Sequence, residues 1–211
     1  MVHVYVTSII GLPDPMEVPE IMAELPEERK EKIQRYKLAE DRKQSLGAGL
    51  LLKKALLMHA ISADKIIYGE NDKPKIEGIC FNLSHSHDMV VCAISEKEVG
   101  CDVEKIKKVK GKIAEHFFTK NEAAYLQALG EEERQNEFFR IWTLKESYLK
   151  MTGEGMKLAL NQFEFVFGEG VKVLRNGEIC NCFIKEYTLP GYKLSVCAEE
   201  AEFAQLQYMP V

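Results

Sequence analysis

The first ten residues form an apolar stretch broken by few polar side chains, which predicts a first β-strand. The stretch lacks both the basic leader and the small-residue cleavage site of a signal peptide. Gly and Pro in residues 11–15 predict a turn. Residues 17–36 are charged and helix-prone, with one interruption at Pro26. The chain therefore starts as a strand followed by helix.

A long helix is predicted from about residue 40 to residue 61, because apolar residues recur there at helical spacing. Lys53 and Lys54 interrupt its apolar part, which falls short of the roughly 18 residues of a membrane span. Short runs of β-branched, aromatic and other apolar residues then predict strands at 65–68, 78–83, 89–95 and 99–103.

The second half of the chain repeats this plan. Helices are predicted at 120–129 and about 136–151, followed by strands at 163–167, 171–174, 180–187 and 192–198. The triplet Val-Cys-Ala ends the strand set of each half, at residues 91–93 and 196–198. Three matching residues leave chance and internal duplication both open. A duplication would create a cleft between the halves, where small-molecule sites preferentially form.

Composition narrows the class of protein. Of 211 residues, 46% are hydrophobic and 29% charged, which suits a folded chain of one large or two small domains. The net charge of −5 argues against a surface devoted to nucleic acid. The six cysteines include no Cys-x-x-Cys pair, and they fit reduced core residues of a cytoplasmic protein better than disulfides.

Two carboxylates, Asp102 and Glu104, are predicted to lie on one face of a strand, because residues two apart in a strand point the same way. Two like charges so close would raise the pKa of one carboxyl group unless a metal ion or a basic side chain compensates them. A solvated strand edge is the alternative interpretation. Mg²⁺ takes such oxygen ligands and completes its shell with water and phosphate, so the pair fits a magnesium site without proving one.

Glu146 and Lys150 are one turn apart on the second long helix and share a face with Trp142, the only tryptophan. An ordinary surface ion pair is one interpretation. The tryptophan indicates that this face is at least partly buried, and a buried carboxylate requires a partner.

A strand at Phe81 is predicted to run into a polar turn at residues 84–87, with the sequence Ser-His-Ser-His. Hydroxyl, imidazole and turn backbone N–H groups favour phosphate binding. A zinc site using His85 and His87, with Cys80 or Cys101, and a plain turn are the alternatives. Basic residues also gather at 29–54 and 105–112, and the second segment could attract an acidic partner or simply be solvated.

Four ordered motifs resemble the 4′-phosphopantetheinyl transferases of the surfactin-synthetase-activating type over nearly the full chain. The family's Gly-x-Asp-x-Glu corresponds to residues 100–104, and its Trp-x-x-Lys-Glu-x-x-x-Lys to residues 142–150. Residues 81–86 match its Phe-Asn-x-Ser-His-Ser, and residues 117–122 resemble its Phe-Phe-x-x-x-Glu.

The resemblance implies an α+β fold, a pseudo-twofold pair of similar halves at 1–100 and 101–211. Each half would pack a long helix on a small, mainly antiparallel sheet, with the active site in the cleft between them. It also implies roles for individual residues. Mg²⁺ would be held by Asp102, Glu104 and Glu146, and phosphates of coenzyme A would meet His85 and Lys150. The rest of the coenzyme A site would comprise Ser84, Lys73 and Pro74 at the nucleotide and, less closely matched, Arg29, Lys32 and Ser45 at the 3′-phosphate.

The reaction implied by the resemblance moves phosphopantetheine from coenzyme A onto a serine of an acyl or peptidyl carrier protein and releases 3′,5′-ADP. Glu146 or a water on the metal would accept the serine proton, and Lys150 would add a second cation. The resemblance further implies a monomer. The cysteines favour the cytoplasm, the net charge argues against nucleic acid as a partner, and the short apolar stretch argues against a membrane span. A coenzyme A or carrier-binding module without catalysis is the rival hypothesis.

Three positions depart from the family's pattern. Asp72 stands where Gly is frequent, Gln44 where a basic residue is frequent, and Arg29 where Lys is frequent. None of these differences involves the three carboxylates.

Overall fold

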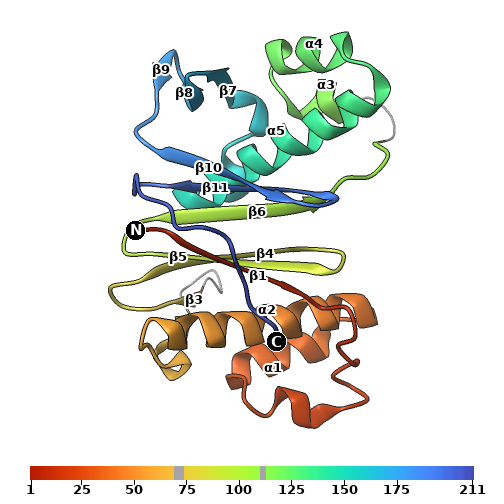
Figure 1. The fold of residues 1–211 in the computed structure, drawn as a ribbon, viewed down its shortest axis with the longest axis vertical. Coiled ribbons are helices and arrows are strands. Elements are labelled where there is room, and N and C mark those ends of the chain that lie inside the picture. The colour runs from red at the N-terminus through yellow and green to blue at the C-terminus, as the bar shows by residue number, and fades with distance from the viewer. Residues whose placement is uncertain (69–73, 110–112) are drawn as a thin grey trace.

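The structure, a computed structural model, describes residues 1–68, 74–109 and 113–211. It confirms an α+β architecture of helices and small antiparallel sheets. Helices cover the two outer sides of the molecule, and two sheets lie between them (Figure 1). The functional residues expected from the sequence come mainly from the strands and helix around the middle of this stack.

The first part of the chain, joined by one short strand from its C-terminal end, forms a sheet with a helical cover. The sheet has the order β12-β1-β5-β4, with β1 (His3–Ser8) parallel to β12 (Gln207–Tyr208), and with β1 and β4 (Cys80–Ser86) antiparallel to β5 (Met89–Ser95). Helix α2 (Ala39–Met58) packs on this sheet, and α1 (Glu27–Arg35) packs on α2. Smaller elements complete this part: the 3₁₀ helices η1 (Pro19–Met22) and η2 (Ala63–Lys65), and the paired strands β2 (Ile67–Tyr68) and β3 (Pro74–Lys75).

The second part begins at β6 (Val99–Lys105), which joins β10 (Phe183–Leu189) and β11 (Tyr192–Ala198) in the sheet order β10-β11-β6. Helix α5 (Glu131–Thr152) packs on β6 and β11. The remaining elements are α3 (Ile113–Phe117), α4 (Lys120–Ala128), η3 (Gly155–Lys157), η4 (Leu160–Gln162), β7 (Phe163–Gly168), β8 (Gly170–Arg175) and β9 (Glu178–Ile179).

The two main sheets share one core, because each buries a row of small apolar side chains toward the other. This core contains Val2, Val4, Val6, Met89, Val91, Ala93, Val99, Cys101, Val103, Leu189, Leu194, Val196 and Ala198. Alternate residues of the same strands point the other way: Cys92 packs with α2, and Cys197 packs with α5. Helices α2 and α5 thus cover the outer faces of the two sheets and form a further apolar core on each of them.

The sequence placed most elements correctly and missed some ends. Helix α5 begins at Glu131, five residues before the expected start, because three glutamates in its first turn suit the positive end of the helix dipole. Short elements such as α3, β3, β9 and β12 were not anticipated. The expectation of a polar turn at 84–87 was wrong in part: Ser84, His85 and Ser86 belong to β4. The turn lies at His87 and Asp88, and His87 has φ 51°.

Two expectations about the whole chain can be compared with the structure. All six cysteines are free thiols, three of them buried. Among the described residues, no helix is both long enough and apolar enough to cross a membrane.

Candidate active site

Strand β4 meets β6 through side chains. Three side chains of β4 accept hydrogen bonds from backbone N–H groups of β6: Asn82 from Cys101 at 3.0 Å, Ser84 from Val103 at 3.3 Å, and Ser86 from Lys105 at 3.2 Å. Residues 82, 84 and 86 point the same way because they alternate along a strand. The motif at residues 81–86 therefore joins the two main sheets.

The two serines of this junction also bind the paired carboxylates. Ser84 donates to Oδ1 of Asp102 at 2.8 Å, and Ser86 donates to Oε2 of Glu104 at 2.8 Å. Asp102 is only 5% exposed, and its Oδ2 has no hydrogen-bond partner within the described part of the chain. A buried carboxylate oxygen without a partner is costly, so this atom is suited to a cation.

Helix α5 brings the second pair of residues to the same place. Gly100 permits this approach, since a Cβ there would lie 2.1 Å from the carbonyl oxygen of Ser147. Lys150 then donates to three oxygens across the helix–strand boundary. Its Nζ lies 2.7 Å from Oδ1 of Asp102, 3.1 Å from Oγ of Ser84 and 3.1 Å from the carbonyl oxygen of Cys101.

Electrostatic effects show that the carboxylates and Lys150 act on one another. Burial raises the pKa of Glu146, the charge of Asp102 raises it further, and Lys150 opposes both. Burial and Asp102 also raise the pKa of Glu104, against the hydrogen bond from Ser86. Burial lowers the pKa of Lys150, but attraction to Asp102 and other negative groups outweighs burial, so the pKa lies above the ordinary lysine value. One lysine therefore faces three carboxylates.

The donor set fits Mg²⁺ by its chemistry. Asp102, Glu104 and Glu146 supply hard oxygen ligands, and Oδ2 of Asp102 is buried and unpaired. As they stand, however, no three His, Cys, Asp or Glu side chains among the described residues are grouped closely enough to hold a metal ion. This finding also means that the alternative zinc ligands His85, His87, Cys80 and Cys101 are not gathered into a metal site.

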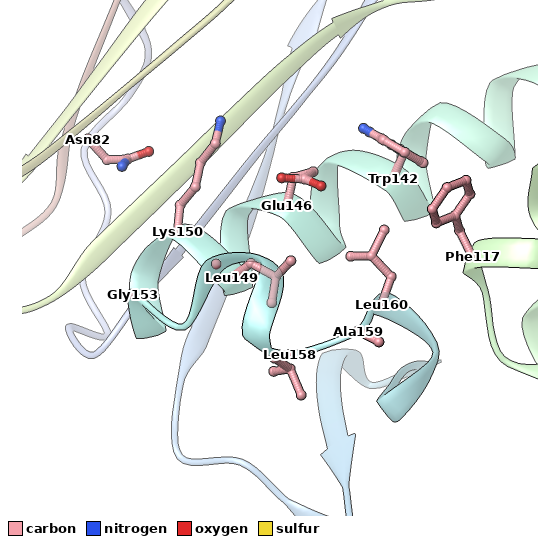
Figure 2. Close-up of a pocket in the computed structure, with 11 residues that line it drawn as sticks. Asn82, Phe117, Trp142, Glu146, Leu149, Lys150, Gly153, Leu158, Ala159 and Leu160 are labelled. Atoms are coloured by element: carbon pink, nitrogen blue, oxygen red, sulfur yellow. The ribbon is translucent and has the colours of Figure 1, made fainter. Parts of the chain in front are cut away.

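A pocket of about 580 Å³ opens beside Glu146 and Lys150. Figure 2 shows these two side chains and Trp142 along α5, with Leu158, Ala159 and Leu160 on the segment that follows the helix. Phe117 packs edge-on against Trp142 with ring centroids 5.8 Å apart. The pocket thus combines a largely apolar wall with two charged groups at one side.

Positive side chains gather near His85, the residue of β4 that lies between the two serines. Desolvation lowers the pKa of His85, and the charges of Lys150, Lys32 and Arg29 lower it further. Ser45 on α2 is buried, and its Oγ has no hydrogen-bond partner among the residues that the structure describes. Of the other two residues expected at the nucleotide, Lys73 lies outside the described residues, and Pro74 is described only as part of β3.

A buried ion pair beneath the pocket was not recognised from the sequence. Lys145 is fully buried, and its Nζ lies 2.9 Å from Oε2 of Glu122. The same Nζ donates to the carbonyl oxygens of Leu160 at 2.8 Å and Phe163 at 2.6 Å. Its signal was present in two motifs, since Glu122 ends the motif at residues 117–122 and Lys145 precedes Glu146 in the motif at residues 142–150. Only the fold shows that they meet.

Comparison with known proteins identifies the family. A sequence model of the 4′-phosphopantetheinyl transferase superfamily matches residues 98–197. The 4′-phosphopantetheinyl transferase Sfp of Bacillus subtilis (strain 168) is 31% identical over 194 residues, which cover 84% of each chain. The transferase gsp of Aneurinibacillus migulanus is 36% identical over 177 residues, covering 81% of this chain and 75% of the relative. The transferase ffp of Bacillus subtilis is 32% identical over 199 residues, covering 90% and 88%.

These relatives define a phosphopantetheine-transferring enzyme, and the chain belongs to the 4′-phosphopantetheinyl transferase superfamily. The resemblance found in the four motifs is therefore confirmed, as is the expectation of an enzyme. The roles of the individual site residues stay predictions.

Proposed function

We propose that this chain transfers 4′-phosphopantetheine from coenzyme A to a serine hydroxyl of an acyl or peptidyl carrier protein and releases 3′,5′-ADP. The observation that carries this proposal is the contact of Lys150 with both Asp102 and Ser84. It joins the carboxylate strand, the His85-bearing strand and the helix of Glu146 in one site. Both halves of the chain contribute to it.

Asp102, Glu104 and Glu146 would hold Mg²⁺. When bound, the ion supplies positive charge that stabilises the transferred phosphoryl group and the leaving group. The raised pKa values of Glu104 and Glu146 support this assignment, because carboxylates that disfavour their charged form gain from a cation. The unpaired Oδ2 of Asp102 supports it independently.

The protein's own groups would perform the other tasks. Lys150 binds a negatively charged phosphoryl oxygen and adds a second cation at the site. Glu146 lies on the same helix face one turn earlier, where its carboxylate could accept the proton of the attacking serine. Glu146 also lines the largely apolar pocket with Trp142.

The phosphates of coenzyme A would meet His85 and Lys150, and the positive charges of Arg29 and Lys32 would lie at the 3′-phosphate. Ser45 would also meet the 3′-phosphate, and its buried hydroxyl, which has no hydrogen-bond partner among the described residues, supports that role. Ser84, Lys73 and Pro74 would complete the nucleotide site. The hydroxyl of Ser84 also holds Asp102, so it would link the nucleotide to the carboxylates.

We also propose that the chain is a pseudo-twofold pair of halves, 1–100 and 101–211, with the active site in the cleft between them. Strands β5 and β11 support this, because each is the middle strand of its antiparallel set, packs with a long helix and carries Val-Cys-Ala. A monomer would suffice, since one chain supplies every site residue. Six free cysteines suit a cytoplasmic location.

Intact-mass spectrometry of an apo carrier protein tests the proposed function. The carrier is incubated with this enzyme, coenzyme A and Mg²⁺, with parallel samples containing EDTA or the Glu146→Gln variant. The carrier should gain the mass of one phosphopantetheine group only in the complete reaction. Coenzyme A binding without any mass gain, across fatty-acid, polyketide and peptide carriers, would instead indicate a binding module.

A further inference from the structure

Ser86 occupies the last position of β4, where the strand of one sheet meets the carboxylate strand of the other. Its side chain is buried, and its residue pairs with Met89 across the two-residue turn into β5. Gln44 of α2 holds this turn, since its Nε2 donates to the carbonyl oxygen of His87 at 3.0 Å. The backbone of Ser86 is therefore fixed from both directions.

The hydroxyl of Ser86 has a defined orientation. Its oxygen accepts the N–H of Lys105 at 3.2 Å, so one lone pair faces the backbone of β6. A hydroxyl has a single proton, and the group within donating distance is Oε2 of Glu104 at 2.8 Å. This bond occupies Oε2 of Glu104 and restricts the rotation of its carboxylate.

Asn82 shows which side-chain group is sufficient to join β4 to β6. It accepts the N–H of Cys101 at 3.0 Å, as Ser86 accepts that of Lys105, but the described contacts of its side chain include no carboxylate. Backbone pairing between the strands can therefore be met by an amide oxygen. The hydroxyl at position 86 adds a donor, and that donor is directed at a carboxylate of the site.

We propose that Ser86 is a positioning residue that holds Glu104 in the orientation needed to bind the metal ion; this rests on the proposed function. Metal-ligating carboxylates are generally held by hydrogen bonds from a second layer of residues, whose loss commonly lowers metal affinity about 10- to 100-fold. The metal ligand, Glu104, comes from one half of the chain, and the residue that positions it, Ser86, comes from the other. The affinity for Mg²⁺ thus depends on the contact between β4 and β6.

Metal affinity is measured by isothermal titration calorimetry with Mg²⁺, on enzyme saturated with coenzyme A. Ser86→Val and Ser86→Thr form the critical pair, because both are β-branched and only threonine keeps the hydroxyl. We expect Ser86→Val to raise the Mg²⁺ dissociation constant about tenfold or more, and Ser86→Thr to stay close to wild type. In carrier assays, Ser86→Val should require more Mg²⁺ for half-maximal rate, with a smaller loss at saturating Mg²⁺.

Asn82→Ala is the matched control, since it removes an acceptor from the junction without removing a carboxylate partner. Its Mg²⁺ dissociation constant should remain near the wild-type value. Equal affinities for Ser86→Val and Ser86→Thr would overturn the role of the hydroxyl, as would an equal loss in Asn82→Ala. Absence of Mg²⁺ binding by the wild-type enzyme would overturn the proposed metal site itself, so the two failures are distinguishable.

Discussion

Gly100 and Ser147 bring the carboxylate strand and the long helix into direct backbone contact. A Cβ at Gly100 would lie 2.1 Å from the carbonyl oxygen of Ser147 and 2.4 Å from the backbone nitrogen of Met151. Real Cβ atoms do not approach backbone atoms so closely, so no other residue fits without a shift of α5. The glycine of the Gly-x-Asp-x-Glu motif therefore sets the distance between Asp102 and the helix that carries Lys150.

Replacing Gly100 with alanine should displace α5 and lower both stability and turnover. Overpacking typically costs about 1–3 kcal/mol. A displacement of about 1 Å at catalytic groups can lower turnover about 100-fold. Thermal unfolding and the rate of carrier modification measure the two effects. Gly168→Ala is the control, because its Cβ would meet no atom within 4 Å. Wild-type turnover in Gly100→Ala would contradict this account of the glycine.

The carboxylate pair and the helix pair could be predicted because local periodicity determines them. Asp102 and Glu104 follow the two-residue alternation of β6, and Glu146 and Lys150 follow the turn of α5. The contact between those pairs depends on Gly100, whose effect appears only when the helix is packed. The serines of β4 were misjudged for the same reason. A polar run resembles a turn until a partner strand supplies its hydrogen-bond donors.

The buried pair of Lys145 and Glu122 should stabilise the segment that forms the pocket wall. Lys145→Met would leave the Glu122 carboxylate buried without its cation, and removing one partner of such a pair typically costs about 3–5 kcal/mol. Urea unfolding should show this loss. The double variant Lys145→Met with Glu122→Gln should recover part of it, because neither charge remains.

A suitable control for that pair is Lys53→Met, which removes an ion pair with the exposed Glu24. Exposed pairs contribute roughly 0–1 kcal/mol, so this variant should unfold close to wild type. Equal losses in Lys145→Met and Lys53→Met would show that burial of the Lys145–Glu122 pair is unimportant.

Asp102→Asn should nearly abolish transfer while leaving the fold intact. The substitution keeps the shape and the hydrogen bond from Ser84 but removes the charge that Lys150 and the metal would share. We expect turnover to fall about 10²- to 10⁴-fold, the usual scale for a lost catalytic or metal contact. Carrier modification measures turnover, and circular dichroism checks the fold. A folded variant with full activity would exclude Asp102 from the site.

The basic segment after β6 should affect carrier binding more than coenzyme A binding. Within its described part, Lys105 lies 3.9 Å from Asp88 and Lys108 lies 3.5 Å from Glu131, both as exposed pairs. Lys110 and Lys112 lie outside the described residues. Reversing the charge of Lys107 and Lys108 should raise KM for an acidic carrier and leave KM for coenzyme A unchanged. Added salt should reproduce the effect in the wild type by screening. Equal KM values for the carrier would identify a merely solvated segment.

Glu146→Gln should make the metal-free enzyme more stable at neutral pH even as it removes activity. Burial and the charge of Asp102 raise the pKa of Glu146 in the folded state, so folding favours its protonated form. The stability gained from protonation is complete below the unfolded-state pKa and is lost as pH rises through the folded-state pKa. At about pH 4 the wild type and Glu146→Gln should therefore unfold at similar temperatures, since Glu146 is largely protonated in both states.

At pH 7 the variant should unfold at a higher temperature, because glutamine carries no buried charge. Thermal unfolding from pH 4 to pH 8, in EDTA, measures the difference between the two proteins and cancels the contributions of other titrating groups. Mg²⁺ with coenzyme A should then reverse the order at pH 7, because binding should stabilise the wild type more than a variant that lacks one metal ligand. A constant difference across the pH range would show that burial of the Glu146 charge does not oppose folding. In the predicted outcome, the charged carboxylate of Glu146 destabilises the folded enzyme when Mg²⁺ and coenzyme A are absent. Binding of Mg²⁺ with coenzyme A then offsets that cost.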